Sequence, residues 1–151
     1  MQNTTIQWTC SRFEDLSALL LYRILQIRQE IFVVEQNCAY LDADGQDGIA
    51  LHLVGKMNDK ICAYARIFPP NNNAGAIIGR VVVHSSARGK GLGYTLMKQA
   101  HQYIEREFPD NPCITLGAQS HLRHFYGNLG YVQNGPEYLE DDIPHIPMIR
   151  K

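Results

Sequence analysis

The chain has 151 residues, of which 45% are apolar and 19% are charged, and its net charge is −1. This length and composition predict one globular domain spanning residues 1–151 and exclude an intrinsically disordered chain. Because lysine and arginine are spread along a nearly neutral chain, we expect no nucleic-acid partner and no membrane surface. Small molecules are the expected partners.

The cysteines and the N-terminal segment indicate the cytoplasm. The four cysteines are widely spaced and form no CxxC pair, so we expect reduced thiols. The first ten residues lack the basic stretch and apolar run of a signal peptide, and no apolar segment is long enough to span a bilayer. We therefore expect a cytoplasmic protein.

The first third of the chain is predicted to contain a short strand and a long helix. Polar and apolar residues alternate over residues 5–9, which is typical of a half-buried strand. Apolar residues then recur at three- and four-residue steps over residues 13–31, which predicts a helix ending near residues 32–35. The Asp- and Gly-rich residues 40–48 are predicted to form a loop.

A hairpin, a strand and a second helix are expected next. Residues 51–55 and 61–68 are apolar runs joined by a short polar link, which predicts an antiparallel pair. The β-branched residues 77–83 predict a central strand. Residues 91–108 carry an apolar helical face, with Pro109 just past its end.

The last third is predicted to be a strand, a short helix and an extended tail. Residues 113–116 read as a strand, after which Ser120 is expected to cap a helix that ends at Gly130. Three prolines in the tail disfavour a helix there. Residues 143–149 are predicted to form a strand at the sheet edge, where proline is tolerated.

The loop of residues 88–93 has the chemistry of an anion cradle. It joins the predicted central strand to the second predicted helix, and the first amides of a helix attract an anion such as a pyrophosphate. Glycines permit close approach, while Arg88 and Lys90 add positive charge. The spacing matches neither a Walker A loop nor a dinucleotide-binding fingerprint.

This loop resembles the R-x-x-G-x-G loop of the GNAT superfamily of N-acetyltransferases, with Arg88, Gly91 and Gly93 at the defining positions. The predicted element order agrees. The FYxxLGY segment agrees with the superfamily as well. More narrowly, the chain is similar to the ElaA-like family through residues 27–36, the acidic residues 42–47, YARIFPP, GRVVV and IPHIPM. The resemblance implies an α+β fold of three layers, in which helices flank a mixed, twisted sheet and acetyl-CoA lies between two splayed central strands.

The same resemblance implies roles for particular residues. Backbone groups of the central strand are expected to bind the pantetheine arm, and amides of the loop are expected to bind the pyrophosphate. These cofactor-binding residues are Val81, Val82, Val83, Arg88, Gly89, Lys90, Gly91, Leu92 and Gly93. Tyr126 is the candidate acid for the departing CoA thiolate. Tyr126 as a core residue is the alternative, since Leu122, Phe125 and Leu129 share or adjoin its helical face.

A general base must remove a proton from the acceptor amine, and the sequence offers several candidates. Glu35, at the end of the first predicted helix, and His84, directly after the central strand, are the two that we name. Glu30, His52 and His145 compete with them, and each has a structural alternative as a solvated carboxylate or a hydrogen-bonded histidine. Arg66 and Arg80 either bind an acidic substrate group or form buried ion pairs.

Metal and thiol chemistry are not expected. His121 and His124 lie three residues apart without a third ligand, and Leu53 stands where a calcium loop would need a bidentate acid. Cys38 is expected to be a small apolar residue rather than a nucleophile.

The sequence thus predicts transfer of acetyl from acetyl-CoA, as co-substrate, to a primary amine of a small molecule or a peptide. A CoA-binding module without catalysis is the alternative, and a nucleotide-binding protein is a third interpretation. The acceptor is not specified. The resemblance also implies a possible homodimer.

Overall fold

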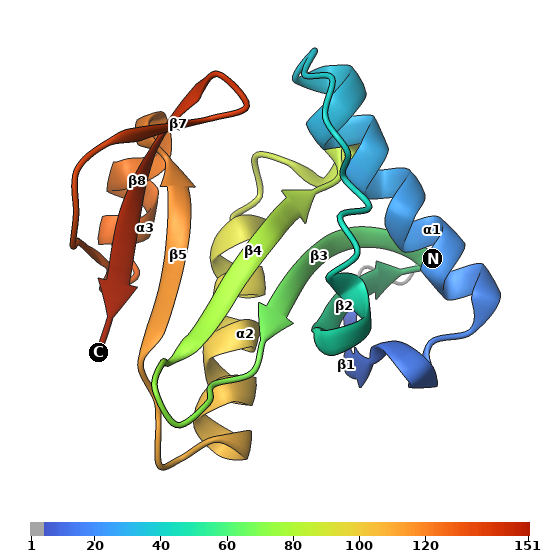
Figure 1. Ribbon diagram of the computed structural model, residues 1–151. Coiled ribbons are helices and arrows are strands. Elements are labelled where there is room, and N and C mark those ends of the chain that lie inside the picture. Colours follow the sequence, from blue (N-terminus) through green and yellow to red (C-terminus); the bar gives the residue numbers. More distant parts are fainter. Residues whose placement is uncertain (1–4) are drawn as a thin grey trace.

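The structure is a computed structural model that describes residues 5–151. These residues form one mixed, eight-stranded sheet with helices on both faces (Figure 1). The strands are β1 (Gln7–Arg12), β2 (Leu51–Met57), β3 (Lys60–Phe68), β4 (Ala76–Val83), β5 (Ile114–Gln119), β6 (Val132–Gln133), β7 (Tyr138–Glu140) and β8 (Ile143–Arg150). The helices are α1 (Ala18–Arg28), α2 (Leu92–Glu107) and α3 (Arg123–Gly127). The predicted three-layer α+β class is confirmed.

The strand order is β1-β2-β3-β4-β5-β8-β6, with β7 also paired to β8. Every pair is antiparallel except β4 with β5. The predicted hairpin and the predicted central strand are therefore confirmed as β2–β3 and β4. The strand predicted for the tail is also present as β8, but its expected edge position is wrong, because β8 lies between β5 and the short strands β6 and β7.

The first predicted helix is divided into three parts. Phe13–Asp15 forms a separate 3-10 turn (η1), and α1 starts only after Ser17, whose side chain accepts a hydrogen bond of 3.1 Å from the Leu20 amide. Over Gln29–Glu35 (η2) the helix widens to π geometry. The amides of Gln36 and Cys38 bond to carbonyls five residues earlier, at 3.1 and 3.0 Å. Such wide turns often occur at functional sites.

Two other boundaries differ from the prediction. The first strand begins at Gln7 and continues to Arg12, beyond the expected residues 5–9. The helix expected to start at Ser120 begins at Arg123, because Ser120–Leu122 forms a 3-10 turn (η5) and the Ser120 hydroxyl donates to Glu137 at 2.8 Å. The second predicted helix is confirmed as α2, which follows the 3-10 turn η4 (Ser85–Ala87).

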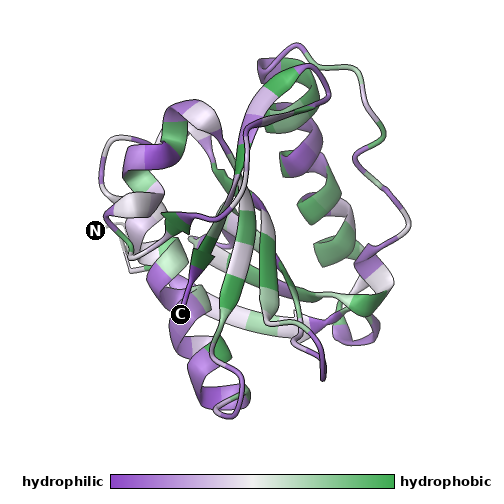
Figure 2. Ribbon diagram, turned by 60° about the vertical axis from the view of Figure 1, so that its left-hand side comes forward, coloured by the Kyte–Doolittle hydropathy of each residue, from purple (hydrophilic) through white to green (hydrophobic). Residues whose placement is uncertain are grey.

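The sheet separates two apolar clusters of unequal size. Helices α2 and α3 cover one face, where they bury the larger cluster around Leu96, Met97 and Ile104. Helix α1 covers the other face with a smaller cluster around Ile24, Ile27 and Tyr64. Figure 2 shows hydrophobic residues along the central strands and along much of α1. No helix within residues 5–151 is long and apolar enough to cross a membrane.

Candidate active site

The central strands β4 and β5 separate over most of their length. They pair only at Ala76 with Ile114 and at Ile77 with Thr115, although β4 continues to Val83 and β5 to Gln119. Each strand keeps its other neighbour, because β4 stays paired with β3 and β5 with β8. A cleft of about 590 Å³ lies at this separation and is lined by η2, β3, β4, β5, α3 and the β7–β8 turn. Figure 1 shows the two strands diverging toward η2.

Strand β4 carries a β-bulge at the cleft wall. Tyr64 pairs with Val82 and Arg66 with Gly79, so three steps along β4 match two steps along β3. Arg80 has a φ of +50°, a conformation that is strained for a residue with a side chain. The bulge leaves Arg80 and Val81 without a register partner on β3, and both residues line the cleft.

The glycine loop after β4 ends at an uncapped helix. Gly89 and Gly91 have φ values of +79° and +73°, and a Cβ on either would meet no atom within 4 Å. Gly91 precedes α2 without a side-chain cap, and the first helical hydrogen bond runs from the Thr95 amide to the Gly91 carbonyl at 3.2 Å. The amides of the first helical turn therefore remain available for an anion. The residues present fit a pyrophosphate.

Arg88 connects this loop to η2. Its Nε donates to the Val83 carbonyl at 3.1 Å, and its guanidinium forms a bidentate ion pair with Glu35. The hydrogen bond from Arg88 holds the pKa of the Glu35 carboxyl below its usual value. Arg88 and Glu35 both line the cleft. A carboxylate that is paired in this way is a weak proton acceptor.

His84 lies beside the cleft but not in its lining. Its Nδ1 accepts from the Ser86 amide at 3.2 Å, and its Nε2 lies 3.8 Å from a Glu30 oxygen. Because Nδ1 accepts, the proton of the neutral ring is on Nε2. His52 is fully buried away from the cleft, where its ring bonds to the Tyr64 hydroxyl at 2.7 Å and the Asp47 carbonyl at 2.9 Å, and burial lowers its pKa.

Tyr126 lies at the boundary between the core and the cleft. It is 6% exposed, packs edge-on against Phe125 and Tyr131, and also lines the cleft. Burial raises the pKa of its hydroxyl to about 12, so the group stays protonated at neutral pH. Its hydroxyl forms no hydrogen bond within residues 5–151. Tyr126 is thus a core residue that also reaches the cleft, and its role as the acid stays a prediction.

A network of six charged residues lies beside the cleft and contributes Arg66 and Arg80 to its lining. Three aspartates from the loop of residues 40–48 contact three arginines from α1, β3 and β4. The ion pairs are Arg28 with Asp42 (2.9 Å) and Asp47 (2.7 Å), Arg66 with Asp44 (2.8 Å) and Asp47 (3.1 Å), and Arg80 with Asp42 (2.8 Å) and Asp44 (3.3 Å). Of the two roles offered for Arg66 and Arg80, the structure shows ion pairs.

Sequence reasoning missed Arg28, the most deeply buried arginine of this network. It is fully buried, and although burial disfavours its charge, the hydrogen bond to Asp47 raises its pKa. The hydrogen bond from Arg66 lowers the pKa of Asp44 to about 2. Burial alone would raise the pKa of Asp47, but the bonds from Arg28 and Arg66 outweigh it and lower that pKa. Three aspartates in one loop were the available signal, since buried carboxylates require cationic partners.

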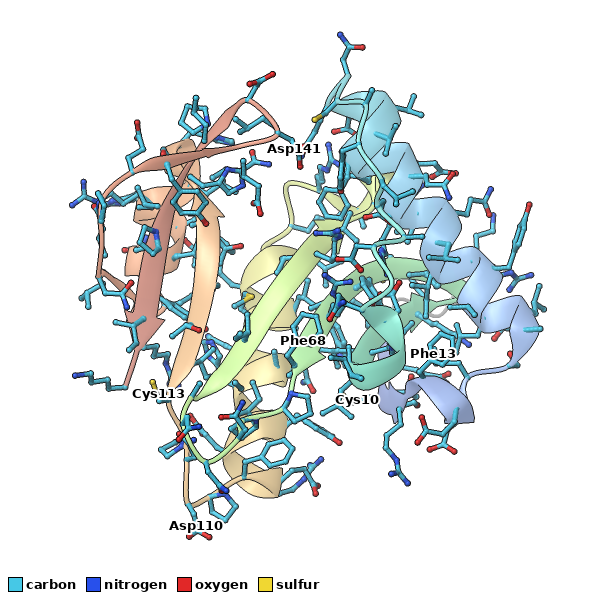
Figure 3. All side chains as sticks on the ribbon, in the orientation of Figure 1. Cys10, Phe13, Phe68, Asp110, Cys113 and Asp141 are labelled. Atoms are coloured by element: carbon cyan, nitrogen blue, oxygen red, sulfur yellow. The ribbon has the colours of Figure 1, made fainter. Side chains whose placement is uncertain are left out.

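The opposite wall consists of the β7–β8 hairpin. Tyr138 covers β5 so closely that a Cβ on Gly117 would lie 2.3 Å from its hydroxyl oxygen. Asp141, labelled at the hairpin turn in Figure 3, faces the end of η2, where the Cys38 thiol donates to its carbonyl at 3.6 Å. Gln119 also donates to Gln36 across the cleft at 3.3 Å. The hairpin and β5 therefore contact the end of η2, which closes one end of the cleft.

Comparisons with known proteins agree with this geometry. The model of the acetyltransferase (GNAT) domain matches residues 28–151. Protein ElaA of Escherichia coli is 42% identical over 97% of both chains. A protein of Synechocystis, UPF0039 protein sll0451, is 41% identical over 95% of this chain and 94% of its own.

Solved structures agree as well. An acyl-CoA N-acyltransferase from Pseudomonas aeruginosa superimposes with a TM-score of 0.92 and 44% identity, covering 97% of this chain and all of the other. The fold also recurs, at 16% identity and a TM-score of 0.70, in an aminoglycoside 6'-N-acetyltransferase complexed with coenzyme A, over 94% of this chain and 96% of that one. The splayed strands, the glycine loop and these relatives lead to one conclusion: the chain belongs to the GNAT acetyltransferase family and, within it, is a homologue of ElaA.

Proposed function

We propose that this single domain, residues 1–151, transfers an acetyl group from acetyl-CoA to a primary amine by direct attack in a ternary complex. The observation that carries the proposal is the junction of two features: the uncapped start of α2 adjoins the cleft between β4 and β5. A pyrophosphate on the loop would direct its pantetheine arm into that cleft. The aminoglycoside 6'-N-acetyltransferase that shares the fold is complexed with coenzyme A, which supports the same donor here.

The donor half of the site is assigned to backbone groups. Val81–Val83 line the cleft, and Val81 lies in the bulge without a partner on β3, so its backbone groups are assigned to the amide groups of pantetheine. The free amides at residues 89–93 suit the phosphate oxygens. Backbone donors near the bulge also suit the thioester oxygen, whose negative charge grows during attack.

Tyr126 is assigned the departing sulfur. Its hydroxyl stays protonated and unbonded within residues 5–151, so it is free to donate to a thiolate. Glu35, one of the two bases named from sequence, is instead assigned to orienting Arg88 because of their ion pair. His84 is the other base named from sequence. In its neutral ring the proton is on Nε2, which lies 3.8 Å from a Glu30 oxygen. Its role as base stays a prediction.

The acceptor is an amine on a small molecule or a peptide, and we expect the reaction in the cytoplasm without metal, nucleic acid or membrane. A homodimer remains a prediction from the resemblance. A CoA-binding module without catalysis is the competing proposal, because the same loop and cleft would serve binding alone.

A thiol-release assay with acetyl-CoA, longer acyl-CoAs and a broad amine panel tests the function. We expect release with acetyl-CoA, and a Tyr126→Phe variant that loses about 100-fold or more in kcat while its acetyl-CoA affinity is unchanged. Tyr22→Phe, 70% exposed on α1, is the matched control and keeps full activity. Tight acetyl-CoA binding without transfer to any amine supports the module, and preference for ATP over acetyl-CoA contradicts both.

A further inference from the structure

One end of the cleft, the apolar end, is lined by Phe68, Ile77, Gly79, Gly117 and Tyr138. Phe68, labelled in Figure 3, pairs with Ile77, the last residue of β4 that also pairs with β5. Ile77 is 43% exposed although it lies inside a central strand. A large apolar side chain that stays exposed in a concave site is a candidate ligand contact. The apolar end therefore suits an apolar group of a substrate.

Gly79 keeps the apolar end open. A Cβ on this residue would meet no atom within 4 Å, and its φ lies outside the left-handed region. Neither the backbone conformation nor a close neighbour therefore requires a glycine here. Because Gly79 lines the cleft, the space that a side chain would fill belongs to the cleft itself. The glycine thus affects what the cleft holds rather than how the chain folds.

Tyr138 forms the other side of the apolar end. Its hydroxyl lies so close over β5 that Gly117 has no room for a Cβ. The ring stacks on His145, whose two nitrogens contact the Ile143 carbonyl at 2.7 Å and a Glu140 oxygen at 3.2 Å. Tyr138 is nevertheless 39% exposed. A positioned aromatic ring therefore borders the same cavity as Gly79.

The positive charge nearest the apolar end is already neutralised. Arg66 pairs with Gly79, and its guanidinium carbon lies 4.8 Å from the centre of the Phe68 ring. Its terminal nitrogens are held by Asp44 and Asp47, at 2.8 and 3.1 Å. Its Nε has no hydrogen-bond partner within residues 5–151, but this atom is buried. An uncharged group therefore fits this surface better than an anionic one.

The apolar end faces away from the donor loop. Ile67 and Ile78 pair with each other and belong to the apolar cluster beneath α2. Because side chains alternate along a strand, the residues next to them face the α1 side of the sheet. These are Phe68, Ile77 and Gly79. The proposed donor site begins at the start of α2, on the other face. A molecule on the apolar end therefore reaches the thioester from the side open to the second substrate.

We propose that the acceptor is a primary amine on an uncharged apolar body, aromatic or branched, which packs over Gly79 against Ile77 and Phe68. Tyr138 covers its other side, and Gly79 sets its size. The inference rests on the proposed acetyl transfer and names the class of its acceptor. Tyr126, 6% exposed and with an unbonded hydroxyl within residues 5–151, lines the same cleft, so the reacting nitrogen and the apolar body share one cavity.

The test uses the full chain, acetyl-CoA and primary amines that differ in their body: phenethylamine, isopentylamine, ethylamine and γ-aminobutyrate. We expect kcat/KM to be about 10-fold or more higher for phenethylamine and isopentylamine than for ethylamine, because each methylene in an apolar pocket contributes about that factor. We expect γ-aminobutyrate to be a poor acceptor, since its carboxylate finds no free cation at the apolar end.

Gly79→Val fills the open space directly. We expect it to keep the wild-type midpoint of urea denaturation and the wild-type affinity for acetyl-CoA, but to lower kcat/KM for phenethylamine relative to ethylamine about 10-fold or more. Gly79→Ala should give a smaller loss. Gly48→Ala is the control, since Gly48 also has open space around its Cβ position but lies outside the lining of the cleft, and it should keep the wild-type preference.

The outcomes separate this inference from the proposed function. Wild-type transfer to ethylamine or γ-aminobutyrate as readily as to phenethylamine overturns the apolar acceptor and leaves the proposed function intact. A Gly79→Val variant that changes the preference among acyl-CoAs instead of amines assigns this surface to the donor and also overturns the inference. Acetyl-CoA binding without transfer to any amine overturns both.

A second variant keeps the test decisive if the Gly79 variants fail to fold. Ile77→Ala removes apolar surface from a side chain that is 43% exposed, so the fold should tolerate it. We expect the KM for phenethylamine to rise more than the KM for ethylamine. Equal KM changes for the two amines contradict the proposed packing.

Discussion

The two layers that flank the sheet are stabilised in different ways. Helices α2 and α3 cover one face of the sheet with a large apolar cluster, and buried polar groups there are few. Helix α1 covers the other face with a small apolar cluster and the network of three arginines and three aspartates. The comparison indicates that the α2 layer is stabilised by apolar packing, whereas the α1 layer also depends on paired buried charges.

The sharpest way to break this contrast is Arg28→Ala. The substitution leaves the buried carboxylates of Asp42 and Asp47 with one cationic partner each in place of two, which we expect to lower the free energy of unfolding by about 3–5 kcal/mol. Urea denaturation measures the change. Arg23→Ala, on the exposed face of the same helix, should cost less than about 0.5 kcal/mol. Equal losses in the two variants would mean that the network contributes nothing particular.

We expect acid to lower the free energy of unfolding through groups of the α2 layer and of the α1 layer in different pH ranges. Burial lowers the pKa of His101, on α2, to about 4 from an ordinary value of 6.5. Above pH 6.5 both the folded and unfolded forms are neutral; below it only the unfolded chain takes up the proton, so stability falls until about pH 4. The full loss is about 3 kcal/mol. His101→Phe should flatten this decline, with only the share of His52 remaining, and His124→Gln should not.

The aspartates of the α1 layer respond at lower pH. Arg66 lowers the pKa of Asp44 to about 2, so this carboxylate stabilises the fold above its ordinary value of 3.8 and loses that effect as the pH falls toward 2. Denaturation curves at closely spaced pH values, compared between wild type and His101→Phe, separate the two ranges. A single decline that His101→Phe leaves unchanged would contradict the division.

Arg80 tests whether its ion pairs hold the bulge. Arg80→Ala removes the bonds to Asp42 and Asp44 and leaves a Cβ at a φ of +50°, whereas Arg80→Gly removes the same bonds without that strain. We expect the glycine variant to be more stable than the alanine variant by about 1 kcal/mol and to retain more transfer activity. Identical stabilities, measured by denaturation, would show that the bulge relaxes without cost.

The smallest effect is expected on the hairpin. Glu140→Gln removes an ion pair whose carboxylate is largely exposed, so the free energy of unfolding should change by less than about 0.5 kcal/mol. Urea denaturation of Glu140→Gln and Arg28→Ala under the same conditions compares their losses in the free energy of unfolding. A loss of several kcal/mol would place the hairpin among the stabilising elements of the cleft.

Elements with a strong local pattern could be predicted from the sequence. In the β2–β3 hairpin, β4 and α2, the apolar residues follow a local pattern that is visible within a few neighbouring residues. Three features could not be predicted: the π turn, the bulge at Arg80 and the interior position of β8. They depend on contacts between distant segments, which the spacing of apolar residues along the chain does not reveal. The Arg28 network was missed for the same reason, since its partners are 14 and 19 residues away along the chain.

Candidate site residues followed the same division. The loop of residues 88–93 was recognisable because its glycines and charges are consecutive, and the structure gives it the backbone geometry of an anion site. The apolar end of the cleft could not be predicted, because the open position of Gly79 depends on its register with Arg66 and on the separation of β4 from β5.

The ion-pair network has a consequence for how acceptor preference can diverge among homologues. Each of its three aspartates touches two of the three arginines, so a single substitution in the loop disturbs at least two secondary-structure elements at once. Substitutions within the network are therefore expected to destabilise the protein. The hairpin across the cleft contains no such network, and homologues that have adopted new amines are expected to differ first along it, beginning at Leu139, which is 69% exposed.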